Sequence, residues 1–184
     1  MKKFMITVLG EDRPGIIAAV TKVLYEQEYN IEEVSQTILQ NQFSCFFIVN
    51  GPEGLSPDQL SQALEAGTSF DLFFHVREIA KTTPAGETPE SEPYVIVTRG
   101  PDRKGLVAGI TAVFAAFGVN VGQLRAVFRG GDEPGNNTMI YEVDIPLSTD
   151  QKKLRKALSD RAQELNLEIT IQHRNIFEAM NRIL

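Results

Sequence analysis

The sequence predicts an α+β protein built from two consecutive βαββαβ modules, in each of which the two helices cover one face of an antiparallel sheet. Three observations lead to this fold class. One stretch of the chain is repeated later in the same register, the spacing of apolar residues switches between strand and helix periods in the same order in both copies, and a segment of linker composition separates the copies. A hydrophobic content of 42% is sufficient for a buried core.

The repeat is clearest at the start of each copy. Phe4–Gly15 recurs as Tyr94–Gly105 without a gap, and the same register matches identical residues of several different types, such as Asp12 with Asp102 and Asn30 with Asn120. The segment 81–93 between the copies contains three prolines, three glutamates and no large apolar residue, which is typical of an exposed linker. We therefore expect a first module over 1–80, a linker over 81–93, and a second module with a C-terminal tail over 94–184.

Each copy begins with a strand followed by a helix. Phe4–Leu9 and Tyr94–Thr98 are short and rich in β-branched residues, and the apolar residues after them recur at helical spacing. A hairpin, a second helix and a last strand follow in both copies. Ser56–Asp58 and Ser148–Asp150 are expected to be the N-caps of the second helices, with acidic first turns. This order is the split-βαβ, ferredoxin-like arrangement. The second copy adds a longer loop at 130–137 and an amphipathic helix at 175–184.

The charge balance argues against direct binding of nucleic acid. The formal net charge is −6 and the isoelectric point is near 5.0, whereas proteins that bind a duplex collect Lys and Arg on one face. The one local exception is the group of basic residues in 152–161. Apolar residues lie between them at helical spacing, so the basic side chains are expected on the solvent side of a helix.

The expected compartment is the cytoplasm. No apolar run reaches the roughly 18 residues that a membrane-spanning helix needs, and the start of the chain leads directly into a strand pattern without a cleavage site. A single cysteine, Cys45, allows no intramolecular disulfide, which fits a reducing environment. We therefore expect no association with a membrane.

No residues stand at spacings typical of catalysis or metal binding. His75 and His173 have no partner residues at a recognisable spacing, and Cys45 lies in an apolar strand pattern that fits a buried side chain. Gly100–Gly105 has the glycine spacing of a phosphate-binding loop, but Leu106 stands where such a loop needs lysine. The sequence therefore predicts no catalytic residue, no metal site and no cofactor.

The turn between the first strand and the first helix carries the most informative chemistry. Gly10 allows a sharp turn, Asp12 can cap the helix, Pro14 fits the first helical turn, and Gly15 leaves the helix amides uncovered. Such a helix N-terminus suits a carboxylate, and Asn30 offers donors and acceptors for the rest of a small zwitterion. The same residues also fit a purely structural role, with Asn30 ending the helix in a left-handed conformation, and spacing alone leaves both interpretations open.

Asp12–Ile16, followed by Asn30 and Ile31 within this order of elements, resembles the ACT domain, a small regulatory module that binds amino acids in many of its members. The resemblance covers nearly the whole chain as two copies. It implies a ligand held where two modules meet, by the first strand–helix loop and by the Asn that opens the second strand. The corresponding residues are Asp12, Arg13, Pro14, Gly15, Ile16, Asn30 and Ile31 in the first copy, and Asp102, Arg103, Gly105, Leu106, Asn120 and Val121 in the second.

Tandem modules of this kind without an attached enzyme are similar to the glycine cleavage system transcriptional repressor group. That similarity implies a non-catalytic, amino-acid-sensing regulatory protein, expected as a homodimer. It would bind a small amino acid, Gly or Ser, and act on a protein partner such as a DNA-binding regulator of glycine or one-carbon metabolism. A structural or interaction module without ligand remains an alternative. An RNA-binding ferredoxin-like domain is less favoured, because the chain is acidic and its strands lack the required aromatic pattern.

Overall fold

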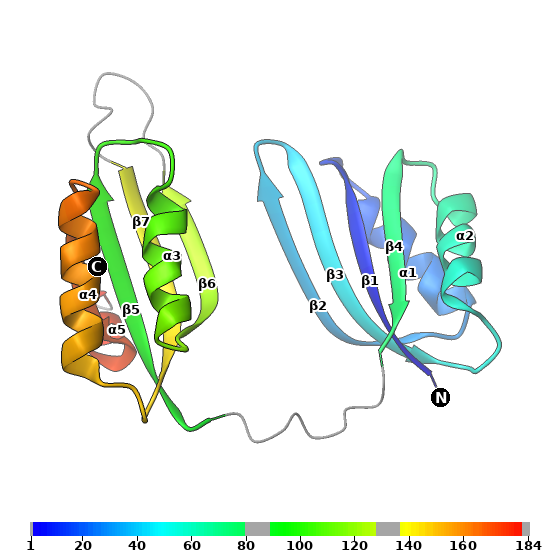
Figure 1. Ribbon diagram of the computed structural model, residues 1–184. Helices are drawn as coiled ribbons and strands as arrows, with labels where there is room; N and C mark the ends of the chain where they lie inside the picture. Colours follow the sequence, from blue (N-terminus) through cyan, green and yellow to red (C-terminus); the bar gives the residue numbers. More distant parts are fainter. Residues whose placement is uncertain (1, 80–88, 128–136, 182–184) are drawn as a thin grey trace. The chain divides into compact units, whose positions relative to one another are not determined.

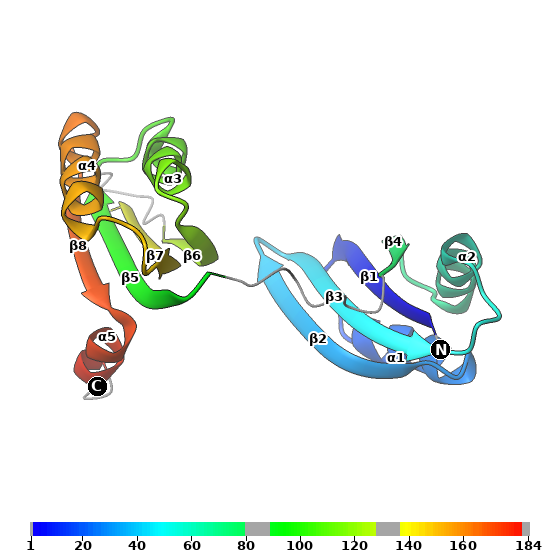
Figure 2. The ribbon, with the colours of Figure 1, turned by 60° about the horizontal axis from the view of Figure 1, so that its bottom comes forward.

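The computed structural model describes residues 2–79, 89–127 and 137–181. The chain divides into two compact units, Met1–Gly86 and Glu87–Leu184. Each unit contains one four-stranded antiparallel sheet with helices packed on it (Figures 1 and 2). The predicted α+β class with two ferredoxin-like βαββαβ modules is confirmed.

The first module has the strand order β2-β3-β1-β4, in which β1 lies between β3 and β4 and pairs antiparallel with both. The hairpin from β2 to β3 turns through Gln40 and Asn41, whose φ angles of 47° and 65° are those of a two-residue turn with both residues left-handed. The elements are β1 (Lys2–Glu11), α1 (Ile16–Glu26), β2 (Asn30–Leu39), β3 (Gln42–Gly51), α2 (Pro57–Gly67) and β4 (Leu72–Glu78).

The second module repeats this topology with the strand order β6-β7-β5-β8. A final helix extends the chain after β8 and contacts β5 and β8. Val95, on the face of the sheet opposite the other two helices, is buried. The elements are β5 (Ser91–Gly100), α3 (Leu106–Ala116), β6 (Asn120–Val127), β7 (Asn137–Pro146), α4 (Gln151–Glu164), β8 (Glu168–His173) and α5 (Arg174–Asn181).

The start of the second module differs from the prediction, because β5 begins at Ser91 and the last residues assigned to the linker belong to this strand. Pro93 lies opposite Asp144 of β7, whereas the pairing with β8 begins only at Tyr94, opposite His173. The missing N–H of Pro93 therefore removes no hydrogen bond from the β8 ladder, which explains why a proline is tolerated at this end of a central strand. Most of the remaining linker and the loop at 128–136 lie outside the described residues.

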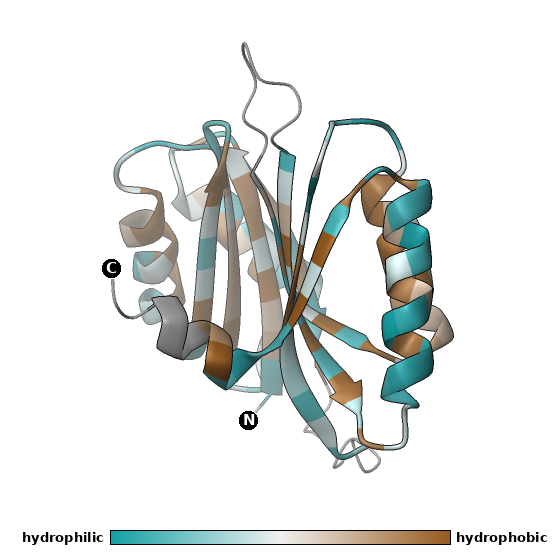
Figure 3. Cartoon of the chain, turned by 90° about the vertical axis from the view of Figure 1, so that its left-hand side faces the viewer, coloured by the Kyte–Doolittle hydropathy of each residue, from teal (hydrophilic) through white to brown (hydrophobic). Residues whose placement is uncertain are grey.

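Each module has its own core between its sheet and the two helices that cover it. Alternate side chains of β1, from Phe4 to Val8, are fully buried, and they pack against apolar residues of α1 and α2. Figure 3 shows the corresponding pattern on the helices, with hydrophobic residues toward the sheet and hydrophilic residues on the outer side. The first core lies within Phe4–Val76 and the second within Tyr94–Leu167, so the two cores share no residue.

Both segments predicted to cap the second helices contain the cap, Ser56 in the first module and Asp150 in the second, but the first turn of α4 has no acidic residue. Ser56 and Gln59 form a capping box, in which the Gln59 N–H donates to Ser56 Oγ at 3.2 Å and the Ser56 N–H donates to Gln59 Oε1 at 2.9 Å. The Asp150 carboxylate accepts hydrogen bonds from the N–H groups of Lys152 and Lys153, each at 3.1 Å. These bonds hold the pKa of Asp150 below its ordinary value.

Candidate functional site

The loop between β1 and α1 begins the helix differently from the prediction. The N-cap is Gly15, with a φ of 97°, and no side chain caps the helix. Asp12 is therefore not the cap, and Pro14 precedes the helix instead of lying in its first turn. The second module has the same arrangement at Gly105, with a φ of 89°. Glycine is needed at both positions because other residues pay a steric cost at positive φ.

The uncapped start of α1 leaves backbone donors available. The first N–H groups of a helix have no partner within the helix, and here no side chain satisfies them. Asp12 is instead fixed through its own N–H, which donates to the carbonyl of Asn41 at 2.9 Å in the neighbouring hairpin. Ile16 and Leu106 are almost completely buried in the cores, so these two predicted site residues can offer a ligand only their backbone.

Gly10 has a different role from the sharp turn predicted for it. It lies within β1, opposite Leu72 of β4. A Cβ atom at this position would lie 2.5 Å from Leu72 Cδ2 and 3.1 Å from the carbonyl oxygen of Asp71. The glycine therefore permits β1 and the segment before β4 to approach closely, and Gly100 has the same role in the second module.

Asn30 opens β2, as predicted, and lies opposite Asn50 of β3. The left-handed residue that ends α1 is Glu28, with a φ of 59°, so the interpretation of Asn30 as the left-handed helix end is wrong. The side chain of Asn30 is exposed and makes no hydrogen bond within the described part of the chain. Ile31 and its counterpart Val121 pack partly against the cores.

One module does not bring the loop and Asn30 together. They lie at opposite ends of α1, whose 11 residues span about 16 Å. Asn30 borders a separate hollow of about 500 Å³, together with Tyr25 and Glu26 at the C-terminal end of the helix. A small zwitterion cannot reach from the Gly15 amides to Asn30 of the same module.

The counterpart loop of the second module is engaged in contacts within its own module. Asn137 donates from Nδ2 to the Asp102 carboxylate at 3.2 Å, and Arg103 donates to the carbonyl of Glu164 at 3.0 Å, at the end of α4. Asn120 opens β6 as Asn30 opens β2. The predicted residues of the second copy thus have the same backbone placement as those of the first, but different partners.

In the first module the loop carries an exposed ion pair. Arg13 contacts Glu11 at 2.6 Å, and Asn41 also donates to the Glu11 carboxylate at 3.4 Å. The hydrogen bond that Arg13 donates to Glu11, and the negative charges of Glu11 and Asp71, raise the pKa of Arg13 above its ordinary value. At the other end of the sheet, Lys3 and Asn50 hold the Glu32 carboxylate, which lowers the pKa of Glu32.

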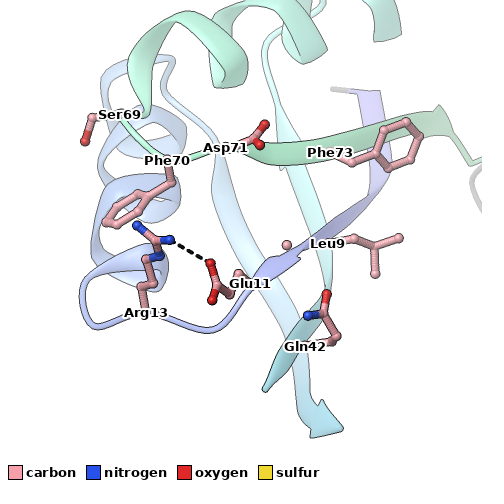
Figure 4. A pocket seen from close by; sticks show the side chains of 9 residues that line it. Leu9, Glu11, Arg13, Gln42, Ser69, Phe70, Asp71 and Phe73 are labelled. Carbon is pink, nitrogen blue, oxygen red and sulfur yellow. Dashed lines mark hydrogen bonds and ion pairs between the residues drawn. The ribbon is translucent and has the colours of Figure 1, made fainter. Parts of the chain in front are cut away.

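A cavity of about 590 Å³ lies beside this loop and was not found by sequence reasoning (Figure 4). Of the predicted site residues only Arg13 lines it, together with the carboxylates of Glu11 and Asp71 and the apolar side chains of Leu9, Phe70 and Phe73. Antiparallel pairing of β1 with β4 brings the segment before β4 alongside the loop. No sequence motif marks this segment, because its position depends on a pairing between distant parts of the chain.

The cysteine and the two histidines show no arrangement typical of a reactive site. Cys45 is fully buried, and burial raises the pKa of its thiol to about 11. The ring of His173 packs edge-on against the ring of Tyr94, with 5.3 Å between the ring centroids, whereas His75 is exposed. Among the residues that the structure describes, no group of three potential metal ligands occurs, and no helix is long and apolar enough to cross a membrane.

Comparisons with known proteins agree with this architecture. The family model for the ACT domain matches residues 2–77 and again residues 92–172. A UPF0237 protein of Methanopyrus kandleri is 39% identical over 66 residues, covering 35% of this chain and 73% of its own length. A UPF0237 protein of Streptococcus mutans is 38% identical over 79 residues, covering 42% of this chain and 90% of its own length.

Two solved structures match the chain over nearly its full length. A protein of unknown function from Galdieria sulphuraria has a TM-score of 0.75 with 23% identity, covering 94% of this chain and 98% of the other. A protein assigned as a glycine cleavage system transcriptional repressor has a TM-score of 0.64 with 16% identity, covering 93% of this chain and 96% of the other. At these identities the similarity establishes the shared tandem fold.

Proposed function

The chain belongs to the ACT-domain family, and from this premise we propose that it is a non-catalytic regulatory protein that senses an amino acid. Its expected ligand is glycine or serine, and its expected compartment is the cytoplasm. The observation that carries the proposal is the start of α1, where a left-handed Gly15 leaves the helix amides without a side-chain cap. Such an N-terminus favours a carboxylate through both its donors and the helix dipole.

The proposed ligand site is shared by two modules. The loop Asp12–Ile16 of one copy of the chain binds the carboxylate, and Asn30 from the first module of a second copy binds the ammonium group. This sharing is required because α1 separates the two sets of residues within one module. The side-chain carboxylate of Asp12, which has no partner within the described residues, provides a second contact for the ammonium group.

Glycine or serine is expected to raise the midpoint of thermal unfolding by several degrees when present at a hundredfold its dissociation constant, because a ligand that binds only the folded state stabilises it. Asn30→Ala should abolish most of this shift and leave the midpoint of the free protein nearly unchanged, since the Asn30 side chain is exposed. The measurement is a thermal-shift series with each of the twenty amino acids.

Thr37→Ala is the matched control, because Thr37 is an exposed residue at the far end of the same strand. It should leave the ligand-induced shift intact. If no amino acid moves the midpoint of the wild-type protein, or if Asn30→Ala keeps the full shift, the sensing proposal is wrong.

A homodimer is the proposed assembly. The edge strand β2 exposes Val34, Ile38 and Leu39, with exposed fractions of 53%, 48% and 69%. An exposed edge with apolar side chains is a surface that proteins normally cover, and pairing with a second copy would cover it.

The proposed signal passes to a protein partner such as a DNA-binding regulator of glycine or one-carbon metabolism.

The alternative is an interaction module that acts by protein–protein contact without a ligand. The observation that favours it is the second loop, where Asp102 and Arg103 are both engaged within their own module. A thermal-shift series without any response would support this alternative, because it predicts partner binding that does not depend on amino acids.

The purified protein is not expected to bind duplex DNA by itself. Its net charge is −6, and several basic residues of the α4 surface already contact carboxylates, as Lys156 contacts Asp160 at 2.6 Å and Arg161 contacts Glu164 at 2.7 Å. A mobility-shift assay at physiological salt should show no retarded band at micromolar protein. Sequence-specific retention at nanomolar protein without a partner would contradict the proposal.

A further inference from the structure

We propose that the first module docks onto the first module of a second copy of the chain through the side of its sheet that α1 and α2 do not cover. In this arrangement β2 of each copy lies opposite β4 of the other. We name this side the open face, which carries Leu9, Glu33, Phe46, Phe73 and Arg77. The contact uses neither the β2 edge nor the proposed amino-acid site, so it can be tested separately from both.

The open face exposes large apolar side chains that lie close together. Leu9 and Phe73 lie directly opposite each other on β1 and β4, with exposed fractions of 39% and 63% (Figure 4). Phe46, on β3, is 40% exposed. Met5 and Ile48, which are also opposite each other, are half-buried and extend the group along the strands. A contiguous apolar surface of this kind marks an interaction site.

The corresponding face of the second module is treated differently by its own chain. Val95, at the position of Met5 in the repeat, is only 3% exposed, and α5 contacts the strands β5 and β8 on which this part of the sheet is built. The apolar pair of β1 and β4 is replaced by Arg99 opposite Glu168. The described part of the first module has no helix after β4. Its open face therefore needs a cover from outside the module.

The charges on the open face identify a second copy as that cover. Glu33 of β2 lies opposite Ile48, Ile48 lies opposite Met5, and Met5 lies opposite Arg77 of β4. The two edge strands thus carry opposite charges at the same level of the sheet. Both charged side chains are exposed, and neither forms an ion pair within the described residues. The second module has Gln123 and Gln172 at these two positions.

This placement of charges is self-complementary under one twofold rotation. An axis parallel to the strands, between β3 and β1, places β2 of one copy over β4 of the other and β3 over β1. Glu33 of each copy then faces Arg77 of the other, which gives two ion pairs per dimer. Between them the apolar groups of the two copies cover each other, as in sheets that pack face to face.

The size of the open face fits an interface of modest strength. β1, β2 and β3 have 10 residues each. From strand spacing and rise, the face measures about 19 Å by 34 Å, so a dimer covers about 1,200 Å² in total, the lower end for stable interfaces. Lys3 and Glu32 contact each other at this end of the sheet, so they add no unpaired charge to the contact.

Charge reversal tests the arrangement, with sedimentation of the full chain at increasing concentration as the measurement. Glu33→Arg and Arg77→Glu each place two like-charge contacts in the interface, so each variant alone should associate at least about a hundredfold more weakly than the wild type. An equimolar mixture of the two variants should restore association, because every substituted side chain then faces an opposite charge on the other chain.

Two further variants complete the experiment. Phe46→Ser should weaken association, since it removes exposed apolar surface from the middle of the contact. Gln36→Arg is the matched control. Gln36 is an exposed residue of β2 opposite Cys45, on the helix side of the sheet, so this substitution should leave association unchanged.

The proposal is overturned if the wild type stays monomeric at millimolar concentration, if both charge variants associate as the wild type does, or if their mixture stays as dissociated as each variant alone. Arg77 lies on β4, away from the β2 edge, so weakened association of Arg77→Glu identifies the open face and not that edge. None of these results bears on amino-acid sensing, which is read from the thermal shift with glycine or serine.

Discussion

Phe47→Ala is expected to destabilise the first module by about 3–5 kcal/mol, the usual cost of removing a large aromatic side chain from a core. Phe47 is 1% exposed and lies on β3, opposite Ile6 of β1 and Val34 of β2, within the first core. Small domains are stable by only about 5–15 kcal/mol, so this loss is a large part of the stability of the module. The second module should keep its own unfolding transition, because the two cores share no residue.

The measurement is urea unfolding followed residue by residue by NMR, which is suitable because the chain contains no tryptophan for fluorescence. Phe114→Ala, in the second core, provides the mirror experiment and should destabilise only the second module. If Phe47→Ala shifts the transitions of both modules equally, the chain folds as one cooperative unit, and the description of two independent cores is incorrect.

Most of the fold could be predicted because it rests on local signals, several of which occur in both copies. The alternation of buried and exposed residues in β1, the left-handed turn at Gln40 and Asn41, and the Ser56 cap are each encoded within a few residues. The start of β5 was missed because Pro93 is unusual in strands. Pro93 fits into β5 because the pairing with β8 begins only at Tyr94, and this pairing joins parts of the chain that are distant in sequence.

The candidate site was predicted less well, for two physical reasons. Gly15 leaves the helix amides without a side-chain cap, as assigned from the sequence, and does so as the left-handed N-cap. Gly10 lies within β1 and permits a close approach to Leu72 instead of the sharp turn assigned to it. The distance between the loop and Asn30 depends on the direction in which α1 runs back along the sheet. A motif read along the chain contains no information about Asp71 and Phe73, which the pairing of β1 with β4 brings to the cavity that Arg13 also lines.

Substitution of Gly100 is expected to cause a second large loss of stability. A Cβ atom there would lie 2.7 Å from the carbonyl oxygen of Asn166 and 3.3 Å from Leu167 Cα. Backbone atoms cannot move aside as a side chain can, so Gly100→Val should destabilise the second module by about 3 kcal/mol, the upper end of the usual cost of overpacking.

Gly10→Val should cost less, because the nearest atom to a Cβ at Gly10 is the side-chain carbon Leu72 Cδ2, and the nearest backbone atom is 3.1 Å away. Gly54→Val is the control, since no atom lies within 4 Å of a Cβ at that position. Urea unfolding of the three variants should therefore rank the losses as Gly100→Val, then Gly10→Val, then Gly54→Val. If Gly100→Val and Gly54→Val lose the same free energy of unfolding, β5 and the segment before β8 do not approach each other as closely as the distances at Gly100 indicate.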